Sequence, residues 1–140
     1  MPRHASRSLA IWSGVLLVVL AAHDLSHALD DGLETPMDQL ALVAVPQWLL
    51  LAVVMAVIVR GDRARGAAAA LLLGPGVTIG FAVAHLLPFS TDSYWDLQPS
   101  LVSWLLALLP AALGLAVAAL AWSQWRAAIS PLGGADAAIS

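Results

Sequence analysis

The amino-acid sequence predicts an all-α integral membrane protein, a bundle of four antiparallel helices with both termini on the cytoplasmic side. Three observations support this fold class. The composition is 61% hydrophobic and only 11% charged, whereas a soluble domain carries about 25% charged residues. Four apolar segments have the length of a membrane span, and the arginines fall on one side if all four segments cross.

The four apolar segments cover residues 9–29, 40–59, 66–87 and 101–122, with approximate bounds. A helix needs about 20 apolar residues to cross a hydrocarbon core of roughly 30 Å. The apolar runs are continuous, which is typical of helices and not of alternating strands. We therefore expect one four-span domain over residues 1–126, followed by a flexible cytoplasmic tail over 127–140.

Charged residues indicate the orientation of these spans. The connecting segments are short, so neighbouring spans should be antiparallel. Four crossings then place every arginine on one face, which the positive-inside rule assigns to the cytoplasm. Most acids fall on the opposite face. The arginines are Arg3, Arg7, Arg60, Arg63, Arg65 and Arg126, and the opposing acids are Asp24, Asp30, Asp31, Glu34, Asp38, Asp92 and Asp96.

This distribution predicts a multi-pass protein of the inner (plasma) membrane, with the lipid bilayer as its main partner. The chain has neither lysine nor cysteine, and its Ala- and Leu-rich composition favours a bacterial source. Without cysteine, thiolate metal sites and cysteine nucleophiles are excluded. No basic patch suggests nucleic-acid binding. A transporter is disfavoured because the inner halves of spans two and four carry no ionisable residue.

Three histidines lie near the predicted outer surface. His23 and His27 are four residues apart, so they share a helix face, and Asp31 continues that face by another turn. Asp24 lies three residues before His27. Counting upward from the arginines places His85, on the parallel third span, level with His27. The same count places His23 about 6 Å deeper, from a rise of 1.5 Å per residue.

Imidazole and carboxylate groups are the ligands that divalent transition metals prefer in proteins without cysteine. We therefore predict a metal site formed by His23, His27 and His85, with Asp24 or Asp31 as the fourth ligand or as a hydrogen-bond partner. Zinc is the first expectation, with copper or iron as alternatives. The site would serve metal handling or metal-assisted chemistry, and the sequence does not decide whether the protein is an enzyme. Haem held by His23 and His85 is a further alternative.

Two other interpretations compete with a metal site. The histidines could be structural, hydrogen-bonded to neighbouring carboxylates or carbonyl groups. The protein could then be a non-enzymatic accessory or scaffolding subunit of a larger membrane complex, with a membrane protein partner or a second copy beside it. Gly76 and Gly80 form a G-x-x-x-G pair, which permits close helix approach. We expect this pair to serve packing within the bundle, with a dimer face as the alternative.

Overall fold

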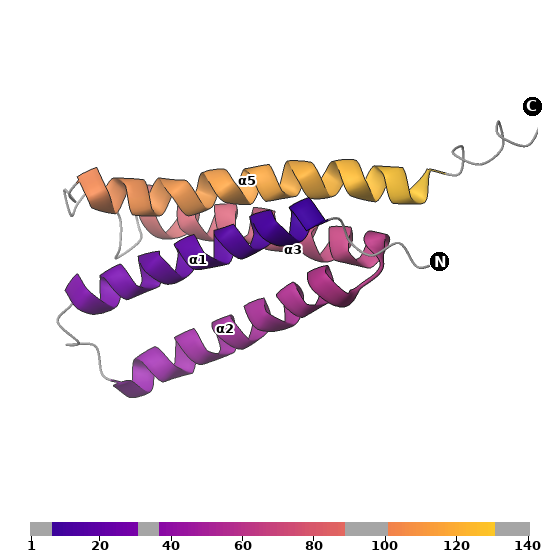
Figure 1. The fold of residues 1–140 in the computed structure, drawn as a ribbon. Helices are drawn as coiled ribbons and strands as arrows, with labels where there is room; N and C mark the ends of the chain where they lie inside the picture. The colour runs from indigo at the N-terminus through magenta and orange to yellow at the C-terminus, as the bar shows by residue number, and fades with distance from the viewer. Residues whose placement is uncertain (1–6, 31–36, 89–100, 131–140) are drawn as a thin grey trace, which may run out of the picture.

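The computed structural model describes residues 7–30, 37–88 and 101–130, with side-chain detail except at 27–30 and 37–43. Four long helices follow one another, and sequence neighbours run in opposite directions (Figure 1). No β-strand occurs within the described ranges. The all-α four-helix fold class is therefore confirmed. The elements are α1 (Arg7–Asp30), α2 (Met37–Arg60), α3 (Arg63–Phe81), the π-helical turn η1 (Ala82–Leu86) that continues α3, and α5 (Leu101–Ile129).

Three of these helices have the length and the apolar composition needed to cross a membrane: Arg7–Ser26 within α1, Arg63–Leu86 across α3 and η1, and Leu101–Ile129. Within α2, the part whose side chains are described is a shorter apolar helix, Ala44–Arg60. Large aliphatic side chains lie exposed on the outside of the bundle; Leu72 and Leu101 are each 75% exposed. Contiguous apolar surface of this kind is costly in water and favourable in lipid. The chain is thus a helical membrane protein.

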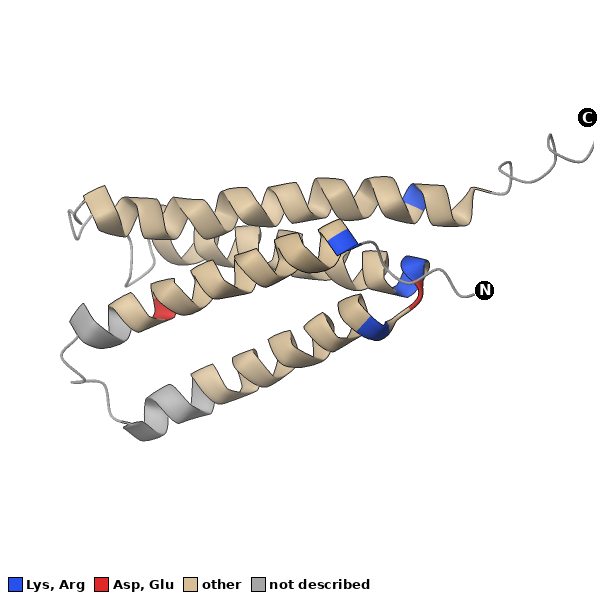
Figure 2. Cartoon of the chain, in the orientation of Figure 1, with Lys and Arg blue, Asp and Glu red and all other residues tan. Residues whose placement is uncertain are grey.

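The described arginines gather at one end of the bundle, while the acidic residue coloured on α1 lies toward the other end (Figure 2). The first residue of α1 and the last residues of α5 lie at this same arginine-rich end (Figure 1). The predicted sorting of cations therefore holds over the described residues. The assignment of the arginine-rich end to the cytoplasm remains a prediction from the positive-inside rule.

Helices α3 and α5 make the most extensive contact of the bundle. Gly74 and Gly114 face each other across it, and a β-carbon at Gly74 would collide with the backbone oxygen of Gly114. The Thr78 hydroxyl donates to the carbonyl oxygens of Gly74 and Ala111, each 3.0 Å away. Apolar burial does not drive helices together in lipid, so small residues and interhelical hydrogen bonds provide the attraction.

The prediction that Gly76 and Gly80 allow close packing inside the bundle is wrong. Both glycines are exposed, and a β-carbon added at either one would have no neighbour within 4 Å. Gly74 and Gly114 fill this role instead. The reason is rotational: a helix turns by about 100° per residue, so Gly76 points well away from the face that Gly74 presents to α5.

Buried side chains along α1 recur every three or four residues, which is the spacing of one helix face. The series is Leu9, Ser13, Leu16, Leu20 and His23. His23 therefore ends the inward face of α1. On α3, the buried series begins at Gly66 and Ala67 and continues through Ala70 and Gly74, and His85 is buried further along, in η1. The two inward faces bring the two histidines toward each other.

Candidate functional site

His23 of α1 and His85 of η1 meet in the interior of the bundle. Their Nε2 atoms are 3.2 Å apart, and the ring centroids are 5.0 Å apart at an interplanar angle of 73°. The two side chains are only 4% and 5% exposed. Ionisable side chains inside a membrane bundle are rare and usually have a function. This contact is therefore the candidate functional site.

The π-helical turn η1 carries His85 at the end of the third span. Single π-helical turns are uncommon and occur frequently at functional sites, because they change the local direction of a side chain. Pro88 follows shortly after the turn and lacks the N–H that a continuing helix would use. The helix ends here, with Leu87 already in an extended conformation, so His85 lies in the last helical turn of the third span.

Phe81 packs against both imidazole rings. Its ring centroid is 4.6 Å from that of His23 in an edge-to-face arrangement and 5.4 Å from that of His85. Aromatic pairs at these separations are stabilised by the electrostatics of edge and face. Phe81 therefore holds the two rings in orientation. The sequence analysis did not identify it, although its position four residues before His85 places both on one helix face.

The count along the spans placed His85 level with His27, and the structure instead pairs it with His23. His23 lies 16 residues after the start of α1, whereas His85 lies 22 residues after the start of α3. Helix α3 extends further toward the arginine-rich end than α1 does (Figure 1). Because the two helices are offset along the bundle axis, equal counts from Arg7 and from Arg65 do not give equal depths.

Asp24 forms a hydrogen bond with a residue of α2. Its Oδ2 atom accepts a hydrogen bond of 3.1 Å from the indole Nε1 of Trp48. This bond links α1 to α2, and it joins residues that are 24 positions apart in sequence. The sequence analysis did not anticipate Trp48 as this partner, because nothing in the local pattern fixes which face of α2 turns toward Asp24.

The remaining predicted ligands are outside the described side chains. His27 lies within α1, but its side chain is not among those described, and Asp31 falls in the undescribed segment that follows α1. Among the described residues, no group of three or more His, Cys, Asp or Glu side chains is close enough to hold a metal ion. The described part of the site therefore consists of the two imidazoles and Phe81.

Two kinds of chemistry suit a separation of 3.2 Å between the Nε2 atoms. A neutral imidazole donates through one ring nitrogen and accepts through the other, so the pair can share one hydrogen bond. Alternatively, a tetrahedral ion bound at 2.0–2.1 Å by two imidazole nitrogens holds those nitrogens about 3.3 Å apart. The observed arrangement thus lies close to the geometry of both a hydrogen-bonded pair and half of a tetrahedral zinc site.

Comparison with models of known protein families, with curated proteins and with solved structures gave no match for this chain.

Proposed function

We propose that the protein is a bacterial plasma-membrane protein that binds a divalent transition metal between α1 and α3. The observation that carries this proposal is the convergence of two buried imidazole nitrogens, 3.2 Å apart, from two different helices. A neutral imidazole is a good ligand for zinc, and also for copper and iron. Zinc is the preferred ion because the spacing agrees with tetrahedral coordination.

A metal ion needs more ligands than these two imidazoles provide. His27 follows Leu20 by seven residues, just as Leu20 follows Ser13, so the sequence places all three on one stripe of α1. Ser13 and Leu20 belong to the buried face. We assign His27 as the third ligand, and Asp31 or a water molecule as the fourth. An open fourth position held by water is the arrangement found in catalytic zinc sites.

The charge distribution favours a cation at this end of the bundle. The described arginines lie at the opposite end (Figure 2), and seven of the acids belong to the predicted outer side. Repulsion among acids in one region is relieved by a bound cation. The predicted function is then metal handling at the outer surface, or chemistry assisted by a metal-bound water.

The test is the metal content of the detergent-purified protein, measured by mass spectrometry of the elements. Wild type is compared with the variants His23→Ala, His85→Ala and His27→Ala. His4→Ala is the matched control, because His4 lies outside the predicted bundle. We expect about one ion per chain in wild type and in the control, and a clear loss in the other three. Equal metal content in wild type, His23→Ala and His85→Ala would overturn the proposal.

A second candidate is an accessory subunit in which the two histidines form a structural hydrogen bond. An apolar groove of about 420 Å³ between α1 and α2 favours it, since a partner helix could fill this space. The lining residues are Leu17, Trp48, Leu51, Ala52, Met55, Ala56, Val59 and Arg60. In this case a partner protein co-purifies with wild type and with His85→Ala alike, and neither preparation contains stoichiometric metal.

A further inference from the structure

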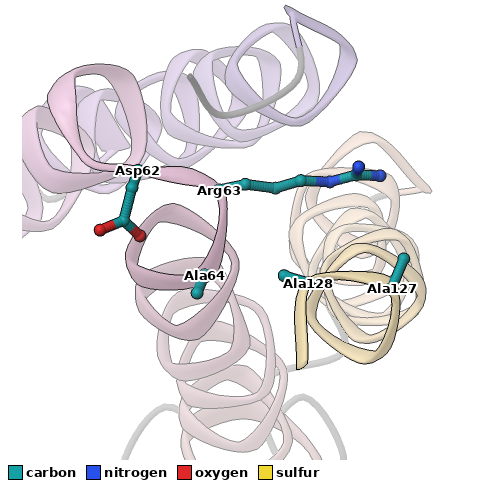
Figure 3. Close-up of a pocket in the computed structure, with 5 residues that line it drawn as sticks. All are labelled: Asp62, Arg63, Ala64, Ala127 and Ala128. Atoms are coloured by element: carbon teal, nitrogen blue, oxygen red, sulfur yellow. The ribbon is translucent and has the colours of Figure 1, made fainter. Parts of the chain in front are cut away.

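A cavity with two charged lining residues lies at the arginine-rich end of the bundle, away from the buried pair of His23 and His85. It has a volume of about 250 Å³ and opens between the start of α3 and the end of α5. Figure 3 shows the lining residues: Asp62, Arg63 and Ala64 from the α3 side, and Ala127 and Ala128 from α5. The alanine side chains are small, so they leave the space beside the charged residues unfilled.

Arg63 supplies the charged hydrogen-bond donor of this cavity. Its side chain extends from the start of α3 across toward α5 (Figure 3). The Nε atom is fully buried and donates to no acceptor within the described part of the chain. A buried donor without an acceptor costs free energy, and more so when the group is charged. An acceptor of negative charge would remove this cost.

Asp62 does not serve as that acceptor. Its Oδ1 atom accepts a hydrogen bond of 2.8 Å from the backbone N–H of Arg65 and so caps helix α3. Its Oδ2 atom lies 3.4 Å from the Nε atom of Arg65. The carboxylate is thus occupied by its own helix and by Arg65, whose side chain is 80% exposed. The guanidinium of Arg63 is therefore left to interact with a negatively charged ligand.

We propose that this cavity binds the phosphate group of an anionic phospholipid, with the guanidinium of Arg63 donating to a phosphate oxygen. Arginine recognises phosphate well because its planar guanidinium presents several donors. The arginine-rich end is the predicted cytoplasmic end, where anionic lipids give the leaflet a negative surface. Phosphatidylglycerol is an anionic lipid of this kind, and its phosphate oxygens are acceptors for the guanidinium.

Lipid binding to the purified full-length protein in a neutral detergent tests the proposal, measured by native mass spectrometry during titration with phosphatidylglycerol. We expect Arg63→Gln to weaken binding by at least about tenfold, the loss of a charged hydrogen bond. Arg65→Gln is the matched control, since it removes the same charge from the exposed partner of Asp62. It should change binding by less than about threefold. An equal loss in both variants would mean general charge attraction and would overturn the site.

Ala128→Leu fills the cavity without changing the charge, and it keeps the test valid if Arg63→Gln does not fold. Binding of phosphatidylglycerol should fall by at least about tenfold in this variant. Unchanged binding, or equal affinity of wild type for phosphatidylcholine, would overturn the proposal. Titration with inorganic phosphate alone distinguishes a lipid headgroup from free phosphate as the ligand. Phosphate occupancy that depends on Arg63, at concentrations similar to those of the lipid, would support phosphate recognition and would assign the site to the free anion.

Discussion

Helix α3 makes two contacts of opposite kinds, with α5 and with α1. Against α5 it packs backbone to backbone, with Gly74 facing Gly114 over the most extensive contact of the bundle. Against α1 it makes one of the smallest contacts, yet this one contains the buried pair of His23 and His85. The α3–α5 contact thus supplies stability through close packing. The α1–α3 contact contains two buried imidazoles, which offer ligand atoms between the helices.

The largest predicted effect distinguishes the proposed metal-binding role of the α1–α3 contact from the stabilising role of the α3–α5 contact. His85→Ala should lower metal affinity by at least about 100-fold, because His85 is proposed as a ligand and not only as a group that supports one. Thermal stability of the metal-free protein should change little, since the α3–α5 contact is intact. Metal titration and a thermal melt of the same sample measure both quantities. A large loss of stability with full metal affinity would reverse the roles of the two contacts.

Acidification should release the metal while leaving the arginine-rich end unaffected. A protonated imidazole has no lone pair for a metal, so affinity is present at neutral pH and falls as the pH is lowered. We expect a fall of more than about tenfold across one pH unit once the histidines become protonated. Arginine stays charged throughout this range, so phosphatidylglycerol binding at Arg63 should persist. Metal release and lipid release at the same pH would point to unfolding of the whole bundle.

Gly74→Ala should act on stability and not on metal binding. The added methyl group would meet backbone atoms of α5, which cannot move as a flexible side chain does. Overpacking of this kind costs about 1–3 kcal/mol. Gly80→Ala is the control, because a β-carbon there has no neighbour within 4 Å. Denaturation in detergent should give Gly74→Ala a clearly lower free energy of unfolding than wild type, and Gly80→Ala a value close to that of wild type.

The smallest effect should come from Trp48→Phe. This change removes the hydrogen bond from the indole to Asp24 while retaining most of the aromatic surface. A hydrogen bond of this type contributes about 0.5–1.5 kcal/mol. Metal affinity should remain within a fewfold of wild type, because the bond ties α1 to α2 and not to α3. Trp12→Phe, at a 47% exposed position, serves as the comparison, and a drop in metal affinity specific to Trp48→Phe would show that Asp24 acts at the site.

Much of the fold was predictable from local pattern. The expected spans agree with the observed helices to within a few residues at most ends, because long apolar runs bounded by arginine, proline or polar segments leave little choice of boundary. The fourth helix is the exception, since it continues to Ile129, beyond the predicted end at residue 122. The segment over residues 123–129, SQWRAAI, includes glutamine, arginine and two alanines, which are good helix formers and support helix without needing lipid.

The candidate site was predictable in its residue types and not in its pairing. Two histidines on parallel spans suggested a shared site, and they do meet. Which histidine of α1 meets His85 depends on the axial offset between the helices. The partner of Asp24 depends on the rotation of α2. Neither the axial offset nor the rotation can be predicted from a local sequence pattern. Both depend on how small residues such as Gly74 and Gly114 fit together.

The sequence by itself determined that this chain is a helical membrane protein with its cations at one end and three of its four histidines, His23, His27 and His85, near the other. Hydrocarbon excludes charge and unpaired backbone groups, so composition and spacing are sufficient for this much. Only the tertiary structure decided that His23 touches His85, that Phe81 holds both rings, and that Arg63 faces a cavity. Contacts between helices depend on the offset and rotation that close packing selects, and these arise only when all four helices are assembled.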